Sequence, residues 1–127
     1  PDVRTLAVCG DGGFLMNVQD LETARRMKLD MTVLVVRDDE YGFIAWHQDE
    51  QGRPNDSISL TNPDLVALAE AFGCTAHRVG PDLDLETALV RAVGEPGVSL
   101  IDCPLDYKTN SQLGRDLLAI AQQELAS

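Results

Sequence analysis

Four short apolar runs, separated by segments of helical or turn character, constrain this chain more than any other feature. The runs occupy residues 3–9, 31–36, 74–79 and 98–103. Each run has the length of a strand, and the second is almost unbroken in apolar residues, as expected of a strand buried on both faces. Strands that alternate with helices predict an α/β fold, in which a parallel sheet carries helices on both faces. Such folds bind ligands at the carboxyl ends of their strands.

Helix boundary signals lie between these runs. Asn17 predicts the N-cap of a helix over residues 18–28. Asn62, followed by Pro63 at the first helical position, predicts the start of another helix, which ends before Gly73. The other expected segments are a short helix at 43–47, a polar loop at 49–61 suited to a mobile flap, a helix at 85–93, and an amphipathic stretch at 113–125 that packs on the outside or on a partner.

The charge balance excludes several classes of partner. Ten Lys and Arg against 21 Asp and Glu give the 127 residues a formal net charge of −11. The resulting field repels nucleic acid and anionic membrane surfaces. No apolar run approaches the roughly 20 residues that a bilayer span requires, and the first residues lack the build of a signal peptide. We therefore expect one cytoplasmic domain with no nucleic-acid or membrane partner.

The cysteines and histidines form no metal or redox pattern. Cys9, Cys74 and Cys103 lack Cys-x-x-Cys spacing, and each lies in or beside an apolar run, so we expect reduced, buried side chains. His47 and His77 have no Cys or His companion at ligand spacing, which argues against a zinc site.

Acidic residues follow the first two apolar runs. Asp11 comes after the first run, and Asp38, Asp39 and Glu40 come after the second. The carboxyl ends of neighbouring parallel strands meet at one edge of a sheet, so these acids are expected to lie close together. Oxygen ligands suit Mg²⁺, which usually takes one or two protein carboxylates and completes its shell with phosphate, water or carbonyl oxygens.

Gly12 and Gly13, beside Asp11, add the features of a phosphate site. Glycines allow close approach of the backbone and present N–H groups, and the start of the following helix carries a partial positive charge. By itself, Gly-Asp-Gly-Gly also fits an ordinary turn. In combination with an acid-rich loop 27 positions later (38 − 11), it suggests a metal-bound phosphate.

Together these residues resemble the motif of thiamine diphosphate enzymes, in which Gly-Asp-Gly is followed at similar spacing by Asn. The resemblance is strongest to the acetolactate synthase branch and extends over residues 3–110. The stretches that carry it are Gly-Asp-Gly-Gly-Phe-Leu-Met-Asn at 10–17, Leu-Glu-Thr-Ala at 21–24, Tyr-Gly-Phe-Ile at 41–44, and Ile-Asp-Cys-Pro-Leu-Asp-Tyr at 101–107.

The resemblance implies two cofactors, thiamine diphosphate and Mg²⁺, and a residue set for them. Asp11 and Asp38 would be side-chain ligands of the metal, and Glu40 would contribute its backbone carbonyl. Gly12, Gly13 and Asn17 would lie along the diphosphate. The full cofactor-binding set is Gly10, Asp11, Gly12, Gly13, Asn17, Asp38, Glu40, Tyr41 and Gly42.

Two positions depart from the family. Asp38 stands where the family most often has Asn, and Arg37 stands where it usually has Asn. Asp38 in place of a neutral Asn adds one negative charge to the pocket. At an effective dielectric of ~20, this charge costs about 3 kcal/mol at a separation of ~6 Å from another negative charge, before screening. The metal and the helix dipole must offset that cost. We therefore expect cofactor binding to depend steeply on divalent cation and to weaken as pH falls through the carboxylate range.

A substrate pocket is implied next to the metal loop. By resemblance, Phe43, Ile44, Trp46 and His47 would flank the reactive ring of the cofactor. An aromatic and aliphatic cluster at this spacing is also typical of a core or an interface. Nothing in the sequence supplies a partner that would orient His47 for proton transfer.

The resemblance further implies that residues 1–127 form the C-terminal part of the diphosphate-binding domain, a fragment of a longer enzyme. The family's activating Glu belongs to a pyrimidine-binding domain, usually across a subunit interface, so no catalytic residue is expected in this chain and alone it should be inactive. The intact enzyme would be a homo-oligomer that decarboxylates pyruvate or a similar 2-oxoacid and transfers the two-carbon unit to a second 2-oxoacid.

Three other interpretations stay open to different degrees. Another thiamine diphosphate-dependent decarboxylase or carboligase would share this half of the site, and a non-catalytic structural or regulatory remnant would share the fold. A phospho-receiver domain also has strand-end acids that bind Mg²⁺. Its acidic pair follows the first strand, whereas here the single Asp11 comes first and the cluster second.

Overall fold

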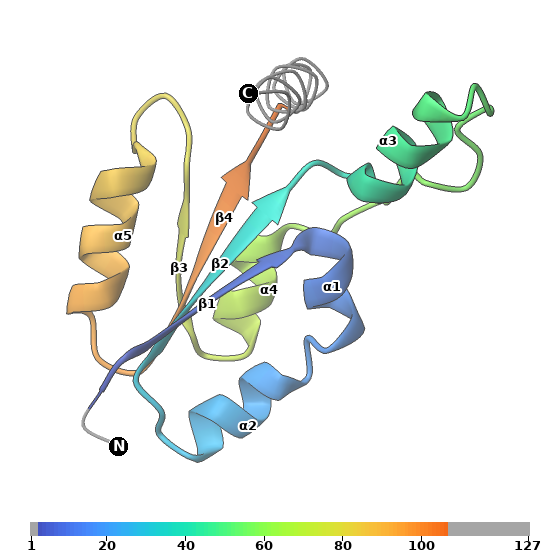
Figure 1. Ribbon diagram of the computed structural model, residues 1–127. Helices are drawn as coiled ribbons and strands as arrows, with labels where there is room; N and C mark the ends of the chain where they lie inside the picture. The colour runs from blue at the N-terminus through green and yellow to red at the C-terminus, as the bar shows by residue number, and fades with distance from the viewer. Residues whose placement is uncertain (1–2, 107–127) are drawn as a thin grey trace, which may run out of the picture.

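A four-stranded parallel sheet forms the centre of the molecule in the computed structural model, which describes residues 3–106 (Figure 1). The spatial order of the strands is β1-β2-β4-β3. Their bounds are Thr5–Gly10 for β1, Met31–Arg37 for β2, Thr75–Arg78 for β3 and Val98–Pro104 for β4. All three pairings are parallel. The predicted α/β fold with a parallel sheet is thus confirmed, with strand ends that differ from the expected ones by one or two residues.

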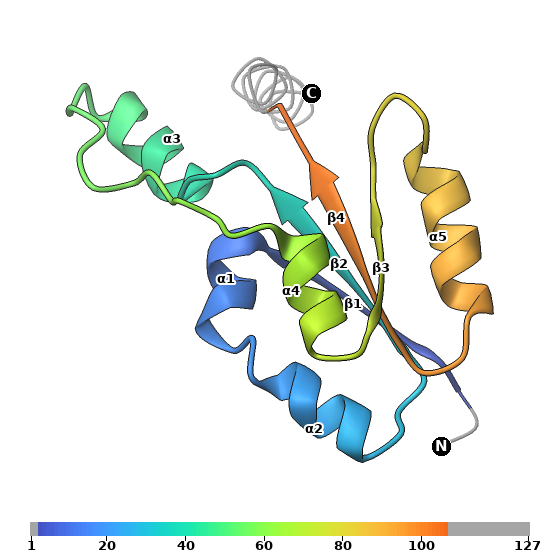
Figure 2. The ribbon, with the colours of Figure 1, turned by 180° about the vertical axis from the view of Figure 1, so that it is seen from behind.

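Helices cover both faces of the sheet, as expected. On one face lie α1 (Asp11–Met16), α2 (Asp20–Arg26) and α4 (Leu65–Ala71), and Figure 2 shows α4 in front of the strands. Their buried side chains pack against alternate residues of the two central strands. The opposite face carries α5 (Leu85–Gly94), where the small residues Ala88 and Ala92 let the helix approach Leu34 and Ile101 closely.

Helix α3 (Gly42–Glu50) projects from the carboxyl end of β2, away from the sheet (Figure 1). It is longer than the expected helix at 43–47. The chain then runs through an irregular segment that returns to the sheet, where Ile58 is buried and Ser59 forms an antiparallel bridge with Glu40. Residues 51–61 therefore form the predicted polar loop, and its role as a flap stays a prediction.

Two predicted helix caps are wrong. Asn17 ends α1, where its N–H donates to the Phe14 carbonyl, and Gln19 precedes α2. The N-cap of α4 is Asp64, whose carboxylate accepts the N–H groups of Val66 and Ala67. An Asn side chain can serve as a cap only where its oxygen faces the first free N–H groups.

Neither predicted cap has the role that its local sequence indicated. Asn62 lies upstream of α4, and its amide is engaged by carboxylates from other elements. The Gly-Asp-Gly-Gly segment after β1, which by itself also fits an ordinary turn, forms the N-cap and first turn of α1. Packing of Phe14 in the core favours the helix despite the low helix propensity of glycine.

The remaining predictions concern the cysteines and the chain end. Cys74 and Cys103 are buried and Cys9 is partly buried, and all three are free thiols whose pKa values burial raises. The amphipathic stretch at 113–125 lies outside the described residues. Within residues 3–106 no helix is long and apolar enough to cross a membrane.

Candidate functional site at the carboxyl ends of β1 and β2

A pocket of about 260 Å³ opens where β1 and β2 end. The crevice rule for parallel sheets predicts a ligand site at this edge. Its lining comes from the end of β1, the first turn of α1, the loop after β2 and the start of α3. The lining residues are Gly10, Asp11, Gly12, Gly13, Val36, Asp38, Glu40, Tyr41, Gly42, Phe43 and Ile44.

Asp11 is the first residue of α1 and is only 2% exposed. Its Oδ1 accepts the N–H of Gly12 at 2.8 Å, and its Oδ2 accepts the N–H of Asp39 at 3.0 Å and the amide of Asn62 at 2.6 Å. These donors satisfy the buried charge and fix the direction of the carboxylate. Three donors against about four lone-pair positions leave capacity for a cation.

Asp38 brings a second carboxylate to the same pocket. Burial is the main cause that raises the pKa of Asp38; the Glu40 N–H bond works against this effect, and the negative charge of Asp11 adds to the rise. That bond is long, at 3.4 Å, so Asp38 is held less firmly than Asp11. A cation between two carboxylates offsets the repulsion between their like charges. The donor set therefore fits a hard divalent ion.

Glu40 lies in a short bridge that leaves its carbonyl available. Tyr41 N–H donates to Ile58 O and Leu60 N–H donates to Asp39 O, each at 2.8 Å, on either side of the bridge between Glu40 and Ser59. Within the described part of the chain, no backbone N–H donates to the Glu40 carbonyl. Because Glu40 also lines the pocket, its carbonyl is a candidate for a third oxygen ligand.

Two glycines are needed for the close packing of the pocket. A Cβ at Gly12 would lie 2.7 Å from Tyr41 Cε1, and a Cβ at Gly42 would collide with Asp38 Oδ2. A Cβ at Gly13 would meet nothing within 4 Å. The backbone around Asp11 is therefore tightly packed on the side of Tyr41 and open at Gly13, which leaves room for a ligand next to the acids.

Some predicted site residues lie elsewhere. Asn17 ends α1 and does not line the pocket. Of the predicted substrate residues, Phe43 and Ile44 line it, whereas Trp46 and His47 do not. Trp46 lies against Phe43 with ring centroids 5.7 Å apart, and His47 shares a hydrogen bond with Gln51 on the exposed part of α3.

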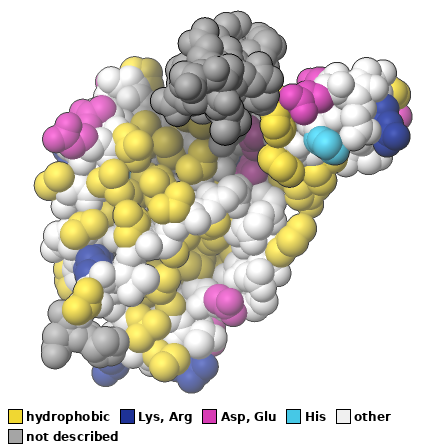
Figure 3. Space-filling view, viewed as in Figure 1, with side chains coloured by type: hydrophobic (Ala, Val, Ile, Leu, Met, Phe, Trp, Pro, Cys, Tyr) yellow, Lys and Arg dark blue, Asp and Glu magenta, His cyan; other side chains and the backbone are white. Residues whose placement is uncertain are grey.

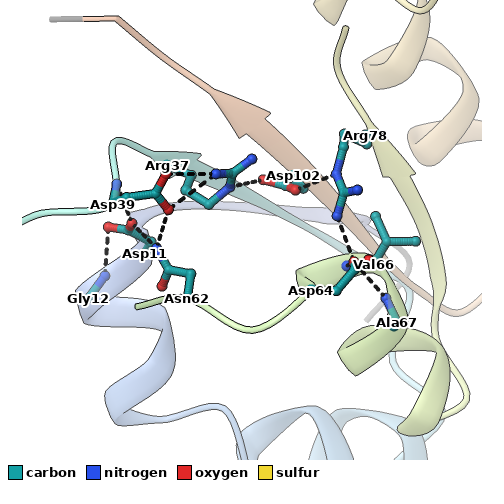
Figure 4. A network of polar contacts seen from close by, with 10 residues as sticks. All are labelled: Asp11, Gly12, Arg37, Asp39, Asn62, Asp64, Val66, Ala67, Arg78 and Asp102. Atoms are coloured by element: carbon teal, nitrogen blue, oxygen red, sulfur yellow. Dashed lines mark hydrogen bonds and ion pairs between the residues drawn. The ribbon is translucent and has the colours of Figure 1, made fainter. Parts of the chain in front are cut away.

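The sequence interpretation missed Asn62, whose amide joins two acids. Its Nδ2 donates to Asp11 Oδ2 and, at 2.7 Å, to Asp39 Oδ1 (Figure 4). The Asn62 bond, followed by the Arg37 bond, lowers the pKa of Asp39. Asn62 Oδ1 is buried with no partner among the described residues, and such an atom costs about 1–3 kcal/mol. The two carboxylates thus dictate the orientation of this amide.

A buried ion-pair network beside the pocket was also missed. Asp102 is fully buried in β4 and accepts Arg37 Nε at 2.9 Å and Arg78 Nε at 2.8 Å. Arg78 also contacts Asp64, the N-cap of α4. The available signal was an aspartate inside the apolar run 98–103, because a charge in a buried strand requires a partner.

No cluster of three His, Cys, Asp or Glu side chains able to hold a metal occurs in the described range 3–106. This agrees with the chemistry of the pocket, where two carboxylates and a carbonyl would have to be completed by ligand oxygens. Mg²⁺ is usually held in this way, with substrate phosphates and waters in its shell.

The fold and this pocket define a class of protein: parallel α/β domains with a ligand pocket at the carboxyl ends of their strands. The family model for the thiamine pyrophosphate enzyme, C-terminal TPP binding domain, matches residues 1–103. The chain belongs to this family.

Acetolactate synthases are among its relatives. Acetolactate synthase from Bacillus subtilis (strain 168) is 35% identical over 118 residues, which cover 93% of this chain and 21% of the relative. The catabolic acetolactate synthase from Raoultella terrigena is 29% identical over 113 residues, covering 89% of the chain and 20% of the relative. The chain thus spans about a fifth of the length of these relatives.

Solved structures show the same fold. Benzoylformate decarboxylase from Polynucleobacter necessarius superposes with a TM-score of 0.74 at 28% identity, covering 81% of this chain and 20% of that protein. A putative thiamin diphosphate-dependent enzyme from Mycobacterium smegmatis gives a TM-score of 0.65 at 29% identity, covering 83% and 18%.

Proposed function

We propose that this chain binds Mg²⁺ and the diphosphate of thiamine diphosphate in the pocket at the ends of β1 and β2. Asp11 and Asp38 would hold the ion with their side chains and Glu40 with its carbonyl, while Gly12 and Gly13 would lie along the diphosphate. The observation that carries the proposal is the meeting of the Asp11 and Asp38 carboxylates in one pocket, beside an open stretch of glycine backbone.

We further propose that the complete enzyme is an acetolactate synthase-like carboligase that uses pyruvate or a similar 2-oxoacid. The bound coenzyme would supply the chemistry that releases CO₂ and passes the two-carbon unit to a second 2-oxoacid. This chain would contribute binding and orientation: the acids would fix the diphosphate end, and Phe43 and Ile44 would supply apolar lining to the same pocket. Support comes from acetolactate synthases that match 93% and 89% of the chain.

A second candidate is a thiamine diphosphate-dependent decarboxylase without the carboligase step. The superposition on benzoylformate decarboxylase, with a TM-score of 0.74, favours this alternative. Product analysis with pyruvate as the only substrate separates the two, because a carboligase joins two substrate-derived units and a decarboxylase releases an aldehyde. Absence of both products, with the coenzyme bound, would favour a non-catalytic remnant of the fold.

We propose a pyrimidine-binding domain and a second copy of the enzyme as partners. On the face shown in Figure 3, hydrophobic side chains gather over the sheet and α5. Leu6 and Val8 on the edge strand β1 are 48% and 62% exposed, and Val90 on α5 is 70% exposed. Apolar surface of this kind is typical of a face that another domain or subunit covers. In isolation the chain should accordingly bind coenzyme poorly and lack activity.

Calorimetric titration of thiamine diphosphate into the full-length enzyme, with Mg²⁺ or with EDTA, tests the binding proposal. We expect binding only with the cation, and a loss of at least about 10-fold in affinity for Asp11→Ala and Asp38→Ala, as for disrupted metal shells generally. Asp38→Asn should keep binding because an amide oxygen is also a Mg²⁺ ligand. Asp20→Ala, on the exposed side of α2, is the matched control. Equal affinity with EDTA would refute the proposal.

A further inference from the structure

Arg37, the last residue of β2, connects a buried acid with the acidic loop, defined here as residues 38–41. Its Nε donates to Asp102 Oδ1 at 2.9 Å, and its Nη1 donates to both carboxylate oxygens of Asp39, at 3.1 and 2.9 Å (Figure 4). The donors of a planar guanidinium form a rigid fork, so one Arg can hold two carboxylates at once. Arg37 thereby ties the acidic loop to the central strand β4.

Asp39 is the residue of the acidic loop that this contact holds. Its φ of 60° lies in the left-handed region, which Asp and Asn adopt more readily than other residues with a Cβ. Arg37 and Asn62 hold its carboxylate, and its N–H donates to Asp11 Oδ2. Because Asp39 lies between Asp38 and Glu40, its backbone sets the direction of both.

We propose that Arg37 is a positioning residue for the divalent cation: it anchors Asp39 to Asp102 and so keeps Asp11 and Asp38 directed at one ion. The inference rests on the proposed function, since it concerns the same pocket. Arg37 does not line that pocket. It acts through Asp39 and has no contact with the ligand.

Charge alone predicts an effect of opposite sign. Arg37 is a cation beside the acids of the pocket, so its neutralisation makes the site more negative and more attractive to a divalent ion. Positioning predicts the reverse, because the acidic loop loses its anchor and the two carboxylates no longer share a fixed geometry. The direction of the change in metal affinity therefore separates the two effects.

Titration of the full-length enzyme with Mn²⁺ alone, in which electron paramagnetic resonance measures the free ion, gives this direction without reference to activity. We expect Arg37→Gln to bind Mn²⁺ about 10- to 100-fold more weakly than the wild type, as for other residues that orient metal ligands. Arg37→Lys should be weakened similarly, because one ammonium cannot reproduce the fork between Asp102 and Asp39.

Arg78→Gln is the matched control. Arg78 contacts the same Asp102 through its Nε, but its other contact is Asp64 and not the acidic loop. This variant removes the same charge from Asp102 and should bind Mn²⁺ close to the wild-type affinity. Thermal unfolding of each variant shows whether it is folded.

Any of three results overturns the proposal. One is that Arg37→Gln binds Mn²⁺ at least as tightly as the wild type does, and another is that Arg37→Lys binds it with wild-type affinity. The third such result is that Arg78→Gln weakens Mn²⁺ binding as much as Arg37→Gln does. If the Arg37 variants do not fold, Asp39→Asn replaces them, because Asn tolerates the left-handed conformation; unchanged Mn²⁺ affinity in that variant also overturns the proposal. Failure of the wild type to bind Mn²⁺ contradicts the proposed function instead.

Discussion

Replacement of Asp102 by Asn should cause a large loss of stability. Asp102 is fully buried and accepts one charged hydrogen bond from each of Arg37 and Arg78. Removal of one side of a buried ion pair generally costs about 3–5 kcal/mol, because the remaining charge has no partner. The side chains of Arg37 and Arg78 are 21% and 45% exposed, so water can recover part of their solvation. We therefore expect the lower end of the range, about 3 kcal/mol.

Urea denaturation followed by circular dichroism measures this loss as a fall in the free energy of unfolding. Thermal unfolding measures it as well: for a domain of about 100 residues, 1 kcal/mol corresponds to about 4–8 °C, so the melting temperature should fall by about 12–24 °C. Glu22→Gln is the matched control, because Glu22 pairs with Arg26 on the surface of α2 and should contribute about 0.5 kcal/mol or less. If Asp102→Asn costs no more than this control, the two guanidinium groups do not depend on Asp102.

Three further predictions concern the core, the glycine packing and acid stability. Leu65→Ala should cost about 2–5 kcal/mol by urea denaturation, because Leu65 is fully buried in the larger core cluster; a loss as small as that of the exposed Val90→Ala would contradict this. Gly12→Ala should lower the free energy of unfolding by about 1–3 kcal/mol, because the new Cβ would collide with Tyr41. Gly13→Ala should leave stability unchanged or raise it. Equal losses of stability in the two variants would refute the packing argument. Hydrogen bonds from the N–H of Thr87, and then from its hydroxyl, lower the pKa of Asp84. Ionised Asp84 therefore stabilises the fold fully above the pKa of an unfolded aspartate, about 3.9. This contribution disappears as the pH falls through the lowered pKa. Asp84→Asn should therefore lower the melting temperature at pH 7 and have no effect near pH 2; a difference that persists at pH 2 would contradict the assignment.

The sheet could be predicted from the sequence because its signal is local and redundant. Residues 31–36 and 98–103 are apolar enough to be buried on both faces, and both are central strands. Once parallel pairing is assumed, the acids that follow the first two strands must meet at one edge. Asp11 and Asp38 are 27 positions apart in the chain (38 − 11) and line one pocket.

The contacts between distant residues could not be predicted, because sequence spacing does not encode them. Asn62 has the local signature of a helix cap, but in the fold it lies next to Asp11, 51 positions away, and its amide donates there. The pairing of Arg37 with Asp102 depends on the register of β2 against β4, which alternation of strands leaves open. The prediction that Asn17 is an N-cap was wrong for a simpler reason: Phe14 packs in the core, and the glycine-rich segment before it forms a helix whose C-cap is Asn17.

Crystals of the full-length enzyme grown with thiamine diphosphate and Mn²⁺ in place of Mg²⁺ test the central claim most directly, because anomalous scattering locates Mn²⁺ without ambiguity. The account predicts one metal peak in direct contact with a carboxylate oxygen of Asp11 and of Asp38, with diphosphate oxygens on its open side. A peak that contacts only one of these aspartates, or a coenzyme bound in another part of the molecule, would contradict it.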